Sequence, residues 1–271
     1  MVTIDHATLA GSDLATLERL VGDLGFEPSY GGPHANGETE MSLVVFPDGS
    51  YLELLAPVRE GATPTRWARH LRAETSPCAW AIPAPDIDAT AERAAAAGIE
   101  VDGPLDGGRD RPDGTRVAWR FAFLGPGDPG AVLPFLIDDE TPREYRVPTD
   151  PVTDAVGGLA RVLVCAREAD APLGRFERAF GASVEHTVAD DALGATVHLL
   201  SEVAGAVVVP DSHTGPLADR LDRYGDCVCG YVFEPGTGVP AESAAASEWG
   251  DRTVEWFAPG DVPVGTFGVV A

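Results

Sequence analysis

Apolar and polar positions recur in one order along the chain: a strand-like stretch, an amphipathic helix, then further strand-like stretches. In the first copy, residues 2–10 read as a strand, and DLATLERLVGDLG (13–25) reads as an amphipathic helix that ends at a glycine. The segments EMSLVVF and SYLELLAP read as two strands around the turn PDGS, and a short strand is expected near Glu27 to Tyr30. This order predicts a β-α-β-β-β module.

The same order returns further along the chain. The helix start SDLAT at 12–16 can be laid over DIDAT at 86–90, an offset of 74 residues. Around the second helix lie the strand-like stretches PCAWAIPA, TRVAWRFAFLG and AVLPFLIDD. These stretches predict a second module.

Two more modules are predicted after VPTDPVTDAVGG, which reads as a linker because of its proline, aspartate and glycine content. We therefore predict an α+β fold of four βαβββ modules, paired into two half-barrel domains with concave mixed sheets. The domain 1–147 contains the modules 1–57 and 77–140 and carries the site, and 157–271 is a degenerate second pair. Ligands are expected at the concave inner face.

The composition is strongly acidic. The 271 residues include 43 aspartates and glutamates but only 19 basic residues, all of them arginine, and the net charge is -24. Such a charge repels phosphate backbones and anionic lipids, so we predict a small-molecule substrate and neither nucleic acid nor membrane as a partner. We interpret the acidity as an adaptation to concentrated salt, in which screening acts within about 3 Å at 1 M. No apolar run approaches the roughly 18 residues of a membrane span, and we predict a cytoplasmic monomer or homodimer.

Several motifs resemble a known family. IDHATLAGSDL, followed by LGFEPSYGGPHANGETEMSLVVFPDGSYLELLAP, resembles the glyoxalase-like branch of the vicinal oxygen chelate (glyoxalase/bleomycin resistance/dioxygenase) superfamily. RDRPDGTRVAWRFAF and LPFLIDD look like the second module of that branch. The specific part of the resemblance is the combination of DH near the start, GGxH after the helix and YLEL on the later strand.

The resemblance implies a divalent metal held by residues of the first and last strands of a module. Carried over to this chain, those ligands are His6 and Glu53, each of which interrupts an apolar strand face. The matching places in the second module are Trp80 and, nearby, Phe135, and neither side chain can bind a metal. A four-ligand site of the family type is therefore absent, and we predict Trp80 and Phe135 as apolar walls of the substrate pocket.

His34 and Glu40, in GGPHANGETEM, are the nearest candidates for completing a smaller site. Two histidines and one carboxylate can form a metal-binding face that leaves positions open for a substrate. We therefore predict His6, His34 and Glu53 as ligands of Mn, Fe, Ni or Zn, with His34 and Glu40 also contacting the substrate. Arg120, in VAWRFAF, is predicted to bind a substrate carboxylate or to pair with Glu53.

Two classes of function remain open. The first is a metal-assisted enzyme of the vicinal oxygen chelate type, a lyase, isomerase or dioxygenase acting on a small oxygenated metabolite, with Glu53 binding the ion or moving a proton. The second is a metal-free binding or sequestering protein of the bleomycin-resistance type, in which Trp80, Phe135 and Arg120 hold a ligand without turnover. His6 with Glu53 favours the enzyme, whereas the missing second-module ligands favour the binding protein.

Overall fold

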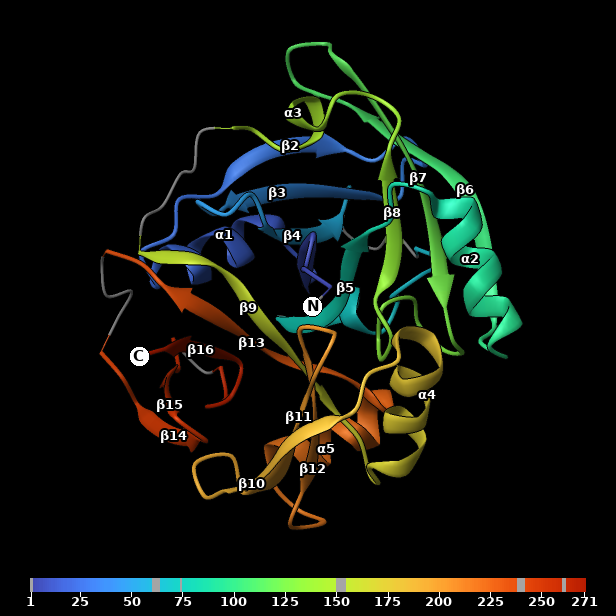
Figure 1. Ribbon diagram of the computed structural model, residues 1–271. Coiled ribbons are helices and arrows are strands. Elements are labelled where there is room, and N and C mark those ends of the chain that lie inside the picture. Colours follow the sequence, from blue (N-terminus) through green and yellow to red (C-terminus); the bar gives the residue numbers. More distant parts are fainter. Residues whose placement is uncertain (1, 60–63, 74, 150–154, 238–241, 260–261) are drawn as a thin grey trace.

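The chain forms two curled mixed sheets of eight strands each, with few helices (Figure 1). This computed structural model describes residues 2–59, 64–73, 75–149, 155–237, 242–259 and 262–271. None of the described helices is long and apolar enough to cross a membrane.

The first sheet has the strand order β2-β3-β4-β1-β5-β8-β7-β6. Its strands are β1 (His6–Ala10), β2 (Ser29–Pro33), β3 (Thr39–Val45), β4 (Tyr51–Pro57), β5 (Ser76–Pro83), β6 (Val101–Asp110), β7 (Arg116–Leu124) and β8 (Phe135–Asp139). Its helices are α1 (Leu14–Gly22), α2 (Ile87–Ala96) and α3 (Arg143–Arg146), with a 3-10 turn at His70–Arg72. The first strands of the two modules, β1 and β5, lie side by side at the centre and pair antiparallel.

The second sheet repeats this arrangement, in the order β10-β11-β12-β9-β13-β16-β15-β14. Its strands are β9 (Val156–Cys165), β10 (Val184–Asp190), β11 (Ala195–Leu200), β12 (Gly205–Pro210), β13 (Cys227–Pro235), β14 (Ala245–Trp249), β15 (Arg252–Phe257) and β16 (Phe267–Val270). Its helices are α4 (Asp170–Phe180) and α5 (Pro216–Tyr224). The described residues between β13 and β14 contain no helix, in line with a degenerate fourth module.

The predicted fold class is confirmed, because each sheet pairs two modules built around a central antiparallel strand pair. The pattern missed β6, β10 and β14, which carry mainly polar, glycine or small residues (VDGPLDGGRD, VEHTVAD and AASEW). Strands at or near a sheet edge need little apolar content, so alternation reveals them poorly. The domain boundaries stay a prediction, and part of the expected linker, 150–154, lies outside the described residues.

Side chains of the first sheet alternate between its two faces, as strand geometry requires, apart from register shifts in the pairs β1–β5, β2–β3 and β6–β7. On β4, Leu52 and Leu54 point outward into the large core, while Tyr51 and Leu55 belong to a separate cluster on the inner face. Glu53 lies between Tyr51 and Leu55 on that inner face and lines a cavity. The alternation therefore sets which residues of each strand can reach a ligand.

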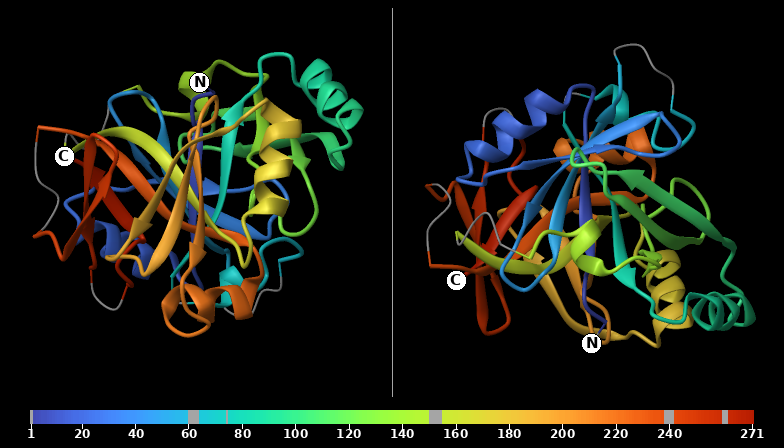
Figure 2. Two further views of the ribbon diagram at one scale, coloured as in Figure 1. Left: turned by 60° about the horizontal axis from the view of Figure 1, so that its bottom comes forward. Right: turned by 90° about the horizontal axis from the view of Figure 1, so that it is seen from above.

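The outer faces of the two sheets pack against each other and form the main core (Figure 2). Phe26 of the first half meets Phe233 of β13 at a ring-centroid distance of 5.6 Å, and Trp80 of β5 meets Phe176 of α4 at 6.2 Å. Tyr231 of β13 donates its hydroxyl hydrogen to the carbonyl of Thr8. The inner face of the first sheet is thereby left free to face away from the second half.

Candidate active site

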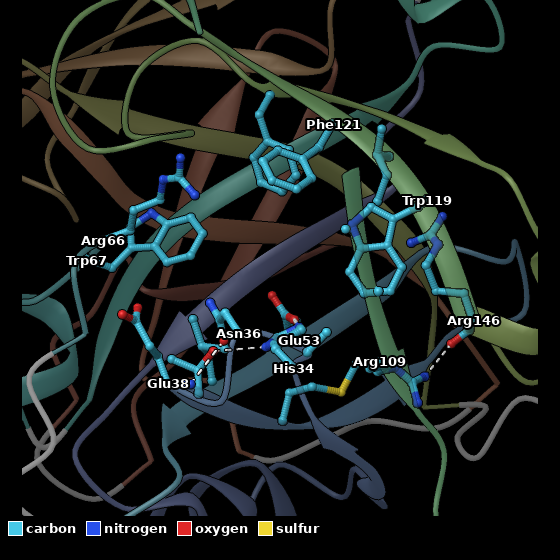
Figure 3. Close-up of a pocket in the computed structure, with 18 of the residues that line it drawn as sticks. His34, Asn36, Glu38, Glu53, Arg66, Trp67, Arg109, Trp119, Phe121 and Arg146 are labelled. Atoms are coloured by element: carbon cyan, nitrogen blue, oxygen red, sulfur yellow. Dashed lines mark hydrogen bonds and ion pairs between the residues drawn. The ribbon is translucent and has the colours of Figure 1, made fainter. Parts of the chain in front are cut away.

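A cavity of about 340 Å³ lies on the inner face of the first sheet, within the size range of small-ligand sites. Figure 3 shows the labelled aromatic side chains around the space above His34 and Glu53. The residues that line it include His6, His34, Tyr51, Glu53, Trp67, Arg109, Trp119, Phe121, Phe123, Phe135 and Arg146. They come from both modules of the first sheet, so neither module forms the cavity by itself.

Glu53 and His34 face each other inside this cavity. The Oε1 atom of Glu53 lies 3.5 Å from Nε2 of His34, and the hydroxyl of Thr8 donates to Oε2 of Glu53 at 3.0 Å. Thr8 and Glu53 are register partners in the parallel pair β1–β4, which explains their contact. One carboxylate oxygen is thus held by the strand next to it, while the other is directed toward the imidazole.

His34 is held as a neutral imidazole. Its side chain is 18% exposed, and burial lowers its pKa, an effect that the neighbouring Glu53 only partly opposes. Nδ1 lies 2.9 Å from the hydroxyl of Thr39. If Nδ1 accepts from that hydroxyl, Nε2 carries the proton and points toward Glu53. The pair then consists of a proton acceptor and a proton donor side by side.

The position of His34 depends on the meeting of two edge strands. His34 follows β2 and forms an isolated antiparallel bridge with Arg109 of β6, although β2 and β6 stand at opposite ends of the sheet order. The backbone N–H of Ala35 also donates to the carbonyl of Gly108 at 2.9 Å. The sheet therefore curls until its edges touch, and this closure brings His34 to the cavity.

His6 lies on the same face as Glu53, on the neighbouring strand. Its ring stacks on Tyr51 at 4.7 Å and meets Phe135 edge-on at 5.3 Å. Its Nδ1 lies 2.7 Å from a carboxylate oxygen of Asp5. His6, Glu53 and Phe135 all line the cavity, and their roles toward a metal or a substrate stay predictions.

Arg146 lines the cavity and is held in place by two carboxylates. Its guanidinium donates to Asp5 at 2.9 and 3.0 Å, to Asp139 at 2.9 Å, and to the hydroxyl of Tyr51 at 2.7 Å. Burial by itself would raise the pKa of Asp5, but Arg146 and His6 hold it well below its usual value. Tyr51 and the same two carboxylates raise the pKa of Arg146 above its usual value against the effect of burial.

The family model described as a glyoxalase-like domain matches residues 4–180, which is more than half of the chain. The chain belongs to this family. The match agrees with the resemblance to the vicinal oxygen chelate superfamily, and a comparison with curated proteins gives no match.

Solved structures show that the fold extends over the whole chain. A hypothetical protein from Staphylococcus aureus aligns with a TM-score of 0.66 at 14% identity, over 99% of both chains. A mutant 4-hydroxymandelate synthase from Streptomyces coelicolor aligns with a TM-score of 0.63 at 17% identity, over 99% of this chain and 91% of that one. The Mn(II)-bound glyoxalase from Novosphingobium aromaticivorans aligns with a TM-score of 0.55 at 14% identity, over 99% of this chain and 82% of that one. At such identities the likeness concerns the fold, and the site itself has to support any reaction.

Three residues predicted to contact the substrate in this glyoxalase-like domain lie outside the cavity. Trp80 points to the outer face of β5, where it is fully buried against Phe176 and donates to the carbonyl of Val132 at 3.1 Å. The register partner of His6 on β5 is Ala81, not Trp80. An alignment that is wrong by one residue moves a strand side chain to the opposite face.

Arg120 and Glu40, which were also predicted to contact the substrate, likewise point away from the cavity. Arg120 of β7 forms a bidentate pair with Asp88 of α2, at 2.6 and 2.9 Å, on the outer face. Glu40 of β3 also points away from the cavity and accepts from the hydroxyl of Tyr30 at 2.9 Å. Arg120 therefore pairs neither with Glu53 nor with a ligand in the cavity.

The neighbours of these residues line the cavity instead. Trp119, Phe121 and Phe123 alternate with Arg120 along β7 and point inward, and Trp67 faces Phe123 at a centroid distance of 6.4 Å. The alternation in VAWRFAF contains this signal, because an inward Trp119 requires an outward Arg120. Arg109 and Arg146 carried no such signal in the sequence.

The donors at the cavity do not form a complete three-ligand metal site among the described residues. Within the part of the chain that the structure describes, no group of three or more His, Cys, Asp or Glu side chains is arranged to hold a metal ion. His34 and Glu53 provide two facing donors, while Nδ1 of His6 is engaged by Asp5. The assignment of His6, His34 and Glu53 as ligands of one ion stays a prediction, and we assign no chemical step to a metal.

The inner face of the second sheet is filled by side chains. Trp249 and Trp256 pack there at a centroid distance of 5.7 Å. The indole of Trp249 donates to Asp190 at 2.7 Å, and the hydroxyl of Ser247 donates to the same carboxylate at 2.8 Å. Large aromatic residues thus occupy the place that is open in the first sheet.

Proposed function

We propose that this glyoxalase-like protein is an enzyme that moves a proton on a small oxygenated metabolite, as an isomerase or lyase of the vicinal oxygen chelate type. The observation that carries the proposal is the facing pair of Glu53 and His34, 3.5 Å apart in a cavity of about 340 Å³. A carboxylate and a neutral imidazole side by side combine a base with a hydrogen-bond donor.

In the proposed step, Glu53 removes a proton from a carbon next to a carbonyl group. The C–H electron pair moves into the carbonyl, whose oxygen becomes an enolate and accepts a hydrogen bond from Nε2–H of His34. Glu53 then returns the proton to the substrate. The Thr8 hydroxyl, which donates to Oε2 of Glu53 at 3.0 Å, would keep Oε1 directed to the reacting carbon.

Hydrogen–deuterium exchange tests this proposal without knowledge of the product. The protein is incubated in D₂O with a panel of small 2-oxo and 2-hydroxy carboxylic acids and the corresponding amides, and loss of the C–H signal is followed by ¹H NMR. We expect exchange with wild type and a decrease of about 10²- to 10⁴-fold in Glu53→Gln, the usual contribution of a general base.

Glu40→Gln is the matched control, because it changes a carboxylate on the adjacent strand that points away from the cavity. This variant should catalyse exchange of the substrate hydrogen at the wild-type rate. Exchange that is equal in wild type and Glu53→Gln would refute the proposal. Exchange that requires added Mn²⁺ and disappears in His6→Ala would support the three-ligand metal hypothesis instead.

A metal-free binding protein is the second candidate. The aromatic walls formed by Trp67, Trp119, Phe121 and Phe123 favour it, because such walls hold flat ligands without any chemistry. This candidate predicts that ligands bind to the cavity and that none of them exchanges.

A further inference from the structure

Arg109 is a cation that is buried at the cavity without a carboxylate partner. Its side chain lines the cavity and only 2% of the residue is exposed. Its two terminal nitrogens donate to backbone carbonyls, those of Gly31 and Arg146. Its Nε has no hydrogen-bond partner, and no ion pair joins Arg109 to any acid among the residues described.

The neighbouring Arg146 is the other arginine among the described residues that is almost fully buried. Arg146 is also 2% exposed, but Asp5 and Asp139 both pair with it. Glu53, which lines the cavity together with Arg109, faces His34 instead. A buried charge is costly unless it is paired and hydrogen-bonded, and an arginine cannot escape that cost by losing its proton. Arg109 thus places a positive charge without a carboxylate partner beside the cavity that it lines, and this charge favours an anionic ligand there.

The walls above Arg109 suit a flat apolar group. Phe121 and Phe123 lie with ring centroids 4.9 Å apart, and Trp119 meets His34 edge-on at 6.2 Å. At the mouth, the guanidinium of Arg66 lies 4.5 Å from the centroid of Phe123. In Figure 3, Trp67 and Trp119 stand on opposite sides of the open space, with Glu53 below them.

We propose that Arg109 selects the anionic group of the ligand, and that the ligand is a small carboxylic acid with a flat apolar body. The carboxylate lies toward Arg109, and the apolar body lies between the aromatic walls. This inference rests on the proposed function in placing the ligand in the cavity of Glu53 and His34, but it concerns binding and not turnover. A carboxylate beside the reacting carbon would also fix that carbon relative to Glu53.

Benzoate and benzamide form a matched pair of probes, because they share shape and aromatic ring and differ in charge. Isothermal titration calorimetry of the full-length protein should show benzoate binding about tenfold or more tightly than benzamide, as expected for a hydrogen bond to a charged group. In Arg109→Gln the affinity for benzoate should fall by about tenfold or more, while that for benzamide changes less than about twofold.

Arg116→Gln is the control for a general loss of positive charge. Arg116 also lines the cavity, but its side chain is 58% exposed and pairs with Asp110 at 3.3 Å, so the preference for benzoate should persist. Wild type that binds both probes equally, or neither of them, would overturn the inference. If Arg109→Gln fails to fold, the comparison of the two probes on wild type still tests whether the cavity selects an anion.

Different results would refute the proton-transfer function and the role of Arg109. A preference for benzoate without exchange in any assay would leave the inference standing and refute the proton-transfer function. Conversely, exchange that depends on Glu53 but is as fast with the amides as with the acids would refute the role of Arg109 alone.

Discussion

Acid should destabilise this protein through His70, a buried histidine between the two halves. The residue is 1% exposed, its ring stacks on Tyr224 of α5 at 4.1 Å, and its Nδ1 lies 2.8 Å from the hydroxyl of Ser76. Burial, with the nearby Arg220, Arg69 and Arg223, lowers its pKa to about 3. The native state therefore keeps His70 neutral.

The magnitude follows from the difference between the folded and unfolded pKa values. An unfolded histidine has a pKa near 6.5, above the folded value. The part of the free energy of unfolding that depends on a neutral His70 is therefore fully present above pH 6.5 and is lost as the pH falls toward 3. The loss amounts to about 1.4 kcal/mol for each pH unit below 6.5, or about 2 kcal/mol at about pH 5.

Urea unfolding followed by circular dichroism at about pH 7.5 and pH 5 measures this effect. Between these two pH values, the free energy of unfolding of wild type should fall by about 2 kcal/mol more than that of His70→Gln, because glutamine has no charge at either pH. Comparing changes cancels any loss that the substitution causes at both pH values. Parallel pH dependence of the two proteins would refute the reasoning.

Two further predictions concern the surroundings of the site. Asp5→Asn should lower the free energy of unfolding by about 3 to 5 kcal/mol, because it leaves the buried Arg146 without one of its carboxylates; urea unfolding measures it, and a change below about 1 kcal/mol would contradict the network. Trp80→Ala should destabilise by about 3 to 5 kcal/mol through a cavity between the sheets, yet leave benzoate affinity unchanged by calorimetry. A clear loss of benzoate affinity in a folded Trp80→Ala protein would mean that Trp80 reaches the ligand after all.

The site residues that were predicted wrongly share one feature, which is that each lies at an outward-facing position of its strand. Trp80, Arg120 and Glu40 each lie on a strand whose immediate neighbours, Ala81, Trp119 and Thr39, face inward. They were selected for their chemistry or by an offset that was wrong by one residue, whereas alternation along each strand decides the face. His6 and Glu53, selected with that alternation in view, do face the cavity.

The sequence by itself determined the repeated modules, the fold class and the inward faces of β1 and β4, because these depend on local periodicity that each segment carries. Only the tertiary structure brought His34 to Glu53 and placed Arg109 beside them. Those contacts arise where the edges β2 and β6 meet, far apart in the chain and at opposite ends of the sheet order. Sheet curvature accumulates over all eight strands, so no local pattern records where the edges will touch.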